Sequence, residues 1–305
     1  MSSRIGSLPP VVRGCLWMSG AVLSFSTMAI AVRELLRHMG IFEVLFFRTF
    51  IALLAVAAYC ALHGFAPLRT GRIGLHTLRN VSHFAGQYCW VFAIGALPLA
   101  TVFAIEFTMP VWVALLARFF LGERFTAPRL VMLALGLAGV MVILKPGAGV
   151  IQPAALIMVL GALCYASTMI TTKSLTRTDS VLAILFWMNL IQSPLALIPA
   201  LPQWSAPALA DAPWIAALAA GSLFAHFCMT RAFRLADAIV VVPIDFLRLP
   251  LIAVVGALAY GEPLDPWVFV GAAIIFAGTY YSLSREGRAP RKASNSPGVS
   301  GSLNK

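Results

Sequence analysis

Four charged residues lie inside long apolar blocks of this chain and are its clearest chemical signal: Arg48, Glu106, Asp245 and Arg248. In an apolar bilayer, such charges are costly unless they are paired or hydrated, so they usually line a pathway. Their formal charges sum to zero, which suits either mutual ion pairing or contact with a zwitterionic molecule. The alternative interpretation is that they form permanent ion pairs that only specify helix packing.

A second group combines polar and aromatic side chains from several apolar blocks. Three of its members are spaced i, i+4 and i+7, so they fall on one stripe of a helix. Such groups can hold a flat or heterocyclic molecule by stacking and hydrogen bonding, and the two histidines are also candidate proton carriers. Polar side chains also commonly join membrane helices, so packing remains an alternative. The group consists of His83, Gln87, Trp90, Trp187, Asn189 and His226.

Prolines lie close to the acidic members of the first group. A proline within a helix removes the hydrogen bond to the carbonyl four residues earlier, so Pro110 frees the carbonyl of Glu106. Pro243 and Pro250 likewise free the carbonyls four residues before them, which lie on either side of Asp245. We expect these three prolines to form hinges or part of a binding region, and static kinks are the alternative.

The elements that must position these residues follow from composition. Of the 305 residues, 60% are hydrophobic and 11% are charged, and the apolar residues fall into blocks long enough to cross a bilayer. The chain is therefore predicted to be an all-α integral membrane protein with about ten transmembrane helices. The blocks lie near residues 14–32, 41–62, 80–97, 99–121, 130–144, 151–170, 181–200, 214–230, 237–260 and 266–282.

The basic residues predict the orientation. The net charge of +11 comes from residues in the joints between blocks, with 17 on one side and three on the other, which excludes a folded nucleic-acid-binding face. Cationic loops remain in the cytoplasm, so both termini are predicted there, in a multi-pass protein of the cytoplasmic (inner) membrane. Residues 1–13 would be the cytoplasmic N-terminus and residues 285–305 a disordered basic tail.

The sequence favours no cofactor, metal or catalytic set. Its five cysteines lie in apolar blocks without a CxxC spacing, and no HExxH, GxSxG or GxxxxGK[ST] motif occurs. We therefore expect neither an enzyme nor an ATP-driven protein.

An internal repeat divides the chain into two halves, residues 14–145 and 146–284. Ile105-Glu106-Phe107 recurs 139 positions later as Ile244-Asp245-Phe246, and Gly122-Glu123 recurs as Gly261-Glu262. Each half has five predicted spans, an odd number, so the second half should be inverted in the membrane relative to the first.

The two five-span halves, each with a proline-containing fourth span, a Gly-Glu pair and an Ala-Gly near the end, resemble EamA-type transporters of the drug/metabolite transporter (DMT) superfamily. The resemblance covers roughly residues 14–284. Phe42-Glu43-Val44, Leu78-Arg79 and Ala236-Asp237-Ala238 are similar to the S-adenosylmethionine-uptake type. The resemblance implies a metabolite carrier that uses an ion gradient or solute exchange.

These observations predict a secondary active transporter that moves a small polar or zwitterionic metabolite, such as an amino-acid derivative or a nucleoside-like or heterocyclic compound, by alternating access. A lipid-linked sugar flippase and, with less support, an intramembrane enzyme are the alternatives. The expected partners are the solute, the lipid bilayer and a proton or counter-solute, without nucleic acid. Four glycines would allow helices to approach closely, either within one chain or in a homodimer: Gly136, Gly139, Gly271 and Gly278.

Overall fold

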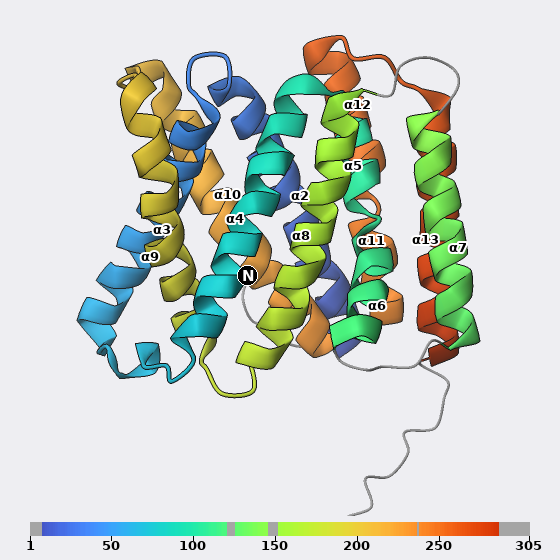
Figure 1. Cartoon of the computed structure of the whole chain (residues 1–305), viewed down its shortest axis with the longest axis horizontal. Helices are drawn as coiled ribbons and strands as arrows, with labels where there is room; N and C mark the ends of the chain where they lie inside the picture. The colour runs from blue at the N-terminus through green and yellow to red at the C-terminus, as the bar shows by residue number, and fades with distance from the viewer. Residues whose placement is uncertain (1–7, 121–125, 146–151, 237, 287–305) are drawn as a thin grey trace, which may run out of the picture.

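The computed structural model describes residues 8–120, 126–145, 152–236 and 238–286, and these residues form helices and their connections without a strand (Figure 1). Gly122, Glu123 and residues 287–305 of the predicted tail lie outside the described residues. The helices are α2 (Pro10–Leu35), α3 (Ile41–His63), α4 (Ile73–Ala96), α5 (Leu99–Glu106), α6 (Met109–Phe120), α7 (Ala127–Leu144), α8 (Pro153–Leu175), α9 (Val181–Ala200), α10 (Ala212–Leu235), α11 (Ala238–Asp245), α12 (Arg248–Tyr260) and α13 (Pro266–Glu286). Short 3-10 turns are η1 (Ala66–Leu68), η2 (Leu201–Gln203) and η3 (Leu209–Asp211).

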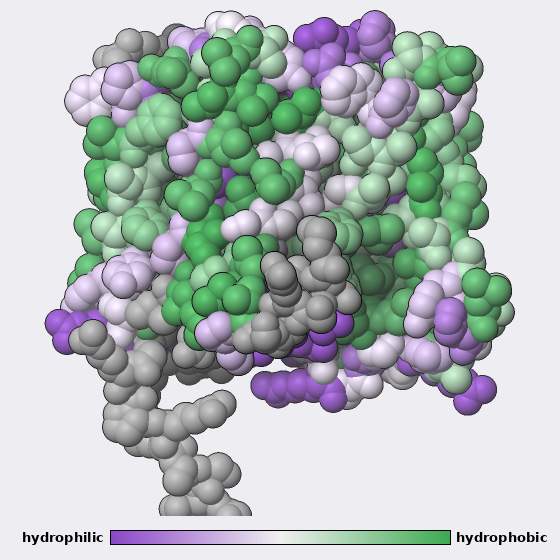
Figure 2. Space-filling model, turned by 180° about the vertical axis from the view of Figure 1, so that it is seen from behind, coloured by the Kyte–Doolittle hydropathy of each residue, from purple (hydrophilic) through white to green (hydrophobic). Residues whose placement is uncertain are grey.

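The outer surface has the character of a membrane protein. Apolar side chains cover the middle of the face in Figure 2, and hydrophilic side chains gather toward its upper and lower rims. In the described chain, nine helical segments are long and apolar enough to cross a membrane. The 24-residue helix α4 lies beside them but is not one of the nine, since it carries several polar side chains. This confirms the predicted fold class, with ten as an approximate number of spans.

The helices of the two halves pack against each other in matching pairs. Helix α2 packs on α10 and α4 packs on α8, while α3 pairs with α9 and α7 with α13. Helices α2 and α8, which begin the two halves, run in opposite directions in Figure 1. The described helical ends of the chain, at Pro10 and Glu286, lie on the same lower face. Each half therefore completes its core only with helices from the other half.

The fourth span of each half, predicted over residues 99–121 and 237–260, is divided into two helices close to the predicted prolines. In the first half α5 ends at Glu106 and α6 begins at Met109, and in the second half α11 ends at Asp245 and α12 begins at Arg248. Pro110 cannot donate to Glu106, and Pro250 cannot donate to the carbonyl of Phe246. The chain instead makes tighter turns, with Thr108 N donating to Ile105 O over 3.0 Å and Leu249 N to Phe246 O over 3.1 Å.

Glycines allow the closest approach between α7 and α13. A Cβ atom at Gly139 would lie 2.6 Å from the backbone oxygen of Gly271, and one at Gly271 would lie 2.6 Å from that of Gly139. Gly136 faces Val111, and Gly278 faces Leu135. The four predicted glycines thus pack within one chain.

Ion pairs join the halves at the upper end of the bundle in Figure 1. Arg33 lies 2.6 Å from Glu262 and also donates to the carbonyl of Leu97. The second carboxylate oxygen of Glu262 accepts from Leu99 N over 2.8 Å. One carboxylate therefore links α2, the start of α5 and the segment after α12.

A second set of contacts joins the halves at the lower end. His76 contacts Asp179 over 2.7 Å, and Thr70 donates to the same carboxylate. Burial raises the pKa of the Asp179 carboxyl, but the hydrogen bonds from Thr70 and His76 outweigh it and leave this pKa below its ordinary value. Arg72 also donates to the carbonyl and hydroxyl of Ser174.

Substituting Gly139 by alanine should destabilise the protein by about 1–3 kcal/mol, because the added methyl meets backbone atoms that cannot move cheaply. The measurement is the melting temperature of purified protein in detergent. Gly74→Ala is the matched control, since a Cβ atom there meets nothing within 4 Å. Equal melting temperatures for the two variants would contradict the close approach of α7 and α13.

Candidate functional site

The two broken spans bring three of the predicted charges together. Arg248 lies 3.4 Å from Glu106 and 3.3 Å from Asp245, so one guanidinium is shared by two carboxylates. The Arg248 side chain is 5% exposed, and the carboxylates are 17% and 24% exposed. The Oδ1 atom of Asp245 is buried without a hydrogen-bond partner. With ionised side chains, this charged cluster has a net charge of −1 and an unused acceptor.

Aromatic rings enclose the guanidinium of the charged cluster. The Arg248 Cζ atom lies 4.7 Å, 5.0 Å and 5.1 Å from the ring centres of Phe25, Phe103 and Phe107. Phe107 stacks at 4.1 Å on Phe246, its counterpart in the repeat. Rings facing a cation stabilise its charge by the π quadrupole and exclude water, so Arg248 is held by both carboxylates and rings.

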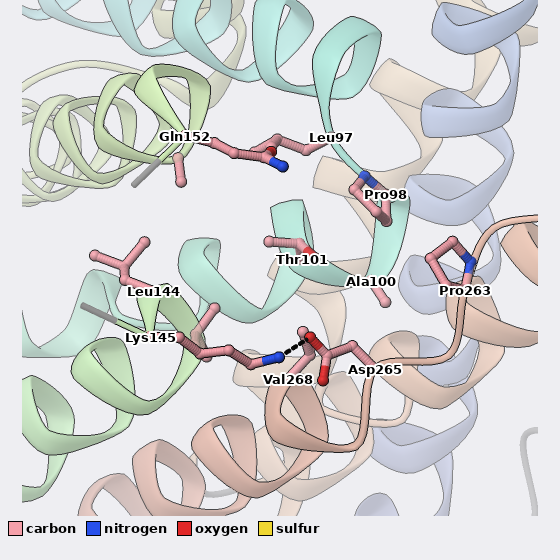
Figure 3. Close-up of a pocket in the computed structure, with 12 residues that line it drawn as sticks. Leu97, Pro98, Ala100, Thr101, Leu144, Lys145, Gln152, Pro263, Asp265 and Val268 are labelled. Carbon is pink, nitrogen blue, oxygen red and sulfur yellow. Dashed lines mark hydrogen bonds and ion pairs between the residues drawn. The ribbon is translucent and has the colours of Figure 1, made fainter. Parts of the chain in front are cut away.

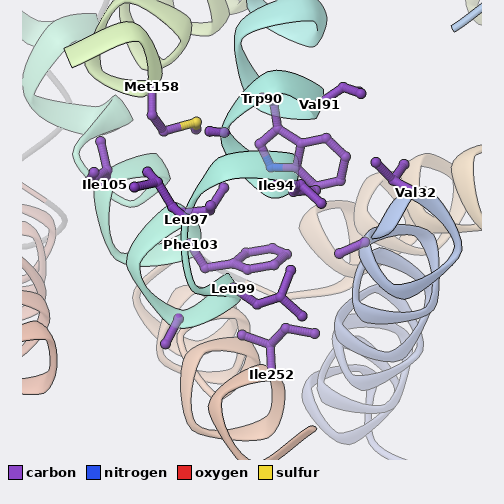
Figure 4. Close-up of a cluster of buried hydrophobic side chains, with 14 of the residues drawn as sticks. Val32, Trp90, Val91, Ile94, Leu97, Leu99, Phe103, Ile105, Met158 and Ile252 are labelled. Carbon is purple, nitrogen blue, oxygen red and sulfur yellow. The ribbon is translucent and has the colours of Figure 1, made fainter. Parts of the chain in front are cut away.

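Trp90 connects the charged cluster to the hydrophobic core. Its indole nitrogen donates to Glu106 over 2.8 Å, and its ring packs edge-on against Phe103 with centroids 6.2 Å apart. Figure 4 shows both rings among buried side chains that include Ile94 and Leu99. The sequence placed Trp90 in the polar and aromatic group but did not predict its bond to Glu106.

Arg48 lies in a separate polar cluster on α3, α4, α9 and α10. Its guanidinium donates to Ser222 over 3.1 Å and to the amide oxygen of Gln192 over 3.2 Å. The amide nitrogen of Gln192 lies 2.9 Å from His83 Nδ1. Gln192 and Ser222 were not predicted, although Ser222 stands 139 positions after His83 and the repeat thus pointed to it.

Two further side chains lie beside members of the two clusters. Tyr165 of α8 faces the ring of His83, with ring centroids 5.8 Å apart. His226 packs edge-on against Phe25 at 5.7 Å, the ring that also faces Arg248. Phe25 and Tyr165 both pack against the buried hydrophobic cluster that contains Trp90 and Phe103, so the two clusters lie in one helical bundle.

The remaining predicted residues have different surroundings. Gln87 is 5% exposed, and its amide makes no hydrogen bond within the described residues. Trp187 donates to the carbonyl of Leu68 near the lower end of the bundle, and Asn189 donates to Leu185 of its own helix. Of the three prolines, Pro110 and Pro250 follow the breaks directly, and Pro243 lies inside α11.

A pocket of about 330 Å³ opens at the upper end of the bundle, away from the predicted charged residues (Figure 3). Thr101, Gln152 and Pro263 line it, and Lys145 crosses it to contact Asp265 over 2.5 Å. The hydrogen bond from Lys145 holds the pKa of the Asp265 carboxyl below its ordinary value. Asp265 also accepts from Trp267 N over 3.0 Å and so caps the start of the last helix.

The model of the EamA-like transporter family matches residues 12–145 and residues 152–284. This chain belongs to the EamA-like transporter family. The broken fourth spans therefore lie at corresponding places in two matched segments of a transporter family.

Its relatives are metabolite transporters. The chain is 27% identical to an S-adenosylmethionine uptake transporter of Rickettsia bellii, over 90% of this chain and 95% of that protein. It is 32% identical to a riboflavin transporter of Rhizobium johnstonii, over 92% of this chain and 94% of that protein. A crystal structure at 17% identity shares the fold, with a TM-score of 0.63 over 90% of this chain and 99% of that one.

Replacing Trp90 by phenylalanine should keep the packing against Phe103 but leave Glu106 Oε2 without its donor. We expect the free energy of unfolding to fall by about 1–3 kcal/mol and the apparent solute affinity to weaken. Thermal melting and transport kinetics in vesicles measure the two effects.

Trp112→Phe is the matched control for this substitution, since it removes a similar indole hydrogen bond, to Thr108. Identical transport kinetics for the wild type, Trp90→Phe and Trp112→Phe would assign Trp90 to packing alone.

Proposed function

We propose that this protein is a secondary active transporter that moves a small polar or zwitterionic metabolite across the cytoplasmic membrane. The observation that carries the proposal is the pair of breaks at Glu106 and Asp245, whose carboxylates share Arg248. Interrupted helices with charges inside a span are expensive in a bilayer and are typical of solute and ion sites. If these helices served only for packing, uninterrupted apolar helices would avoid the cost of two breaks and three charges inside the spans.

Alternating access would follow from the arrangement of the halves. We propose that they are inverted repeats and that their relative movement exposes the charged cluster to each side in turn. The upper contacts of Arg33 with Glu262 would have to break for the upper side to open, and the lower contacts of His76 with Asp179 for the lower side. Pro110 and Pro250 would serve as hinges, because neither can donate a hydrogen bond to the carbonyl four residues earlier.

The charges suggest the class of solute. The cluster of Glu106, Asp245 and Arg248 carries an excess negative charge, which attracts a proton or a cationic group of the solute. Relatives named for S-adenosylmethionine and for riboflavin both suggest a heterocyclic solute. Trp90 and Phe107 could stack on such a ring if the side chains rearrange.

Replacing Asp245 by asparagine should leave a folded protein, because Arg248 retains Glu106 at 3.4 Å. Transport should fall by about tenfold or more, since neutralising one member of a buried charge pair changes binding or conformational free energies by about 2–5 kcal/mol. Uptake of S-adenosylmethionine and of riboflavin into vesicles, with and without a pH gradient or internal solute, measures the loss and the mode of coupling.

Asp265→Asn is the control for Asp245→Asn, because it removes a carboxylate and an ion pair outside the spans. Loss of transport only in Asp245→Asn supports the proposed site. Wild-type transport in Asp245→Asn together with a lowered melting temperature would show that the cluster only holds helices together.

Reporter fusions test the proposed orientation. The lower face in Figure 1 carries the basic connections after α3 and α8 and the basic last turns of α10, so it should face the cytoplasm. A fusion after Lys173 and one at Lys305 should report the cytoplasm, and one near Gln203 should report the opposite side. A C-terminal reporter outside the cytoplasm would contradict both the orientation and the inverted arrangement.

A further inference from the structure

Arg48 is a buried cation with only neutral partners. The residue is 2% exposed and donates to Ser222 and Gln192, which carry no charge. Its Nε atom is buried and has no hydrogen-bond partner. The guanidinium is therefore buried, charged and incompletely hydrogen-bonded.

The described carboxylates do not supply its counter-charge. No carboxylate oxygen of the described residues lies within 4.0 Å of the Arg48 nitrogens. Glu43, five residues before Arg48 on α3, accepts from Ser205 and Gly40 instead. Glu106 and Asp245 are both held by Arg248. This contrasts with Arg248, which contacts two carboxylates and three aromatic rings.

The geometry points to Arg48 as the subsite for a carboxylate group of the transported solute. This inference rests on the proposed transport function. A guanidinium presents its donors in a planar fork that binds a carboxylate through two parallel hydrogen bonds. Arg48 has an unused donor at Nε, and exchange of its weak neutral contact with Ser222 for the solute would provide a second. The remaining contact with Gln192, which His83 steadies, orients the guanidinium.

The two clusters together define a class of solute. Arg48 supplies one positive charge, and the cluster of Glu106, Asp245 and Arg248 supplies one net negative charge. His226 packs against Phe25, the ring that also faces Arg248. A solute with a carboxylate at one end and a cationic group at the other, as in α-amino acids and their derivatives, complements both. Binding would then bring the missing counter-charge to Arg48, so the solute-bound state avoids a cost that the empty state bears.

Paired competitors test the carboxylate directly in the wild-type protein. S-adenosylmethionine and its decarboxylated analogue differ only in the carboxylate, and amino acids with their amides form similar pairs. We expect the acids to stabilise purified protein against thermal unfolding and to inhibit uptake of labelled S-adenosylmethionine about tenfold or more better than their partners. In Arg48→Gln this preference should disappear, and in Arg48→Lys part of it should remain.

Arg37→Gln serves as the control variant, since Arg37 is 55% exposed and pairs with Glu34 on the surface. It should keep the wild-type preference. An unchanged preference for the acids in Arg48→Gln, in protein that still transports, would overturn the subsite and leave the proposed transport function intact. Failure of every acid to stabilise the wild-type protein beyond its amide would also overturn the subsite. Absence of transport of S-adenosylmethionine and riboflavin, with intact folding, would count against the proposed function for these solutes.

Discussion

The middle of this molecule depends on one guanidinium that two carboxylates share. Arg248 keeps Glu106 and Asp245 from facing each other as uncompensated like charges in a medium that solvates ions poorly. Each acidic residue ends a half-helix, so their common contact with Arg248 also fixes how the two breaks meet. The stacked rings of Phe107 and Phe246 close the same junction by apolar contact. Charge pairing and ring packing thus act on corresponding residues of the two halves.

Broken backbone inside a span is tolerated only where protein shields it from lipid. Ile105 is fully buried and Phe107 is 5% exposed, so the first break is packed inside the bundle. The partner helices come from the opposite half, since α2 packs on α10 and α4 on α8. Such packing explains why neither half could bury its polar residues without the other.

Much of the architecture was predictable because apolar block length and proline position have direct physical meaning. The blocks located the spans, and the repeat identified Glu106 and Asp245 as equivalent. The breaks themselves were not predicted, because a proline shows which hydrogen bond is lost but not whether the helix bends or stops. Helix α4 begins at Ile73, before the predicted block. Contacts of His76 and Arg79 with the other half offset the desolvation of the polar side chains in its first turns.

The site was harder to predict than the fold. Spacing along one helix placed His83 and Trp90 on a common stripe, yet they serve different clusters because their partners come from different helices. Gln192 was missed, since one amide in an apolar block gives no signal of what it contacts. Asn189 carries a similar amide but donates to its own helix, a local bond that sequence reasoning could not separate from a contact between helices.

The central claim is that the clusters around Arg248 and Arg48 contact the solute during transport. An experimental structure with a transported solute bound tests it most directly. The account predicts solute between these clusters, with at least one contact of Glu106, Asp245 or Arg248 exchanged for a contact to the solute. Solute bound elsewhere, for example in the pocket beside Lys145, with every contact of Arg248 and Arg48 unchanged, would contradict it.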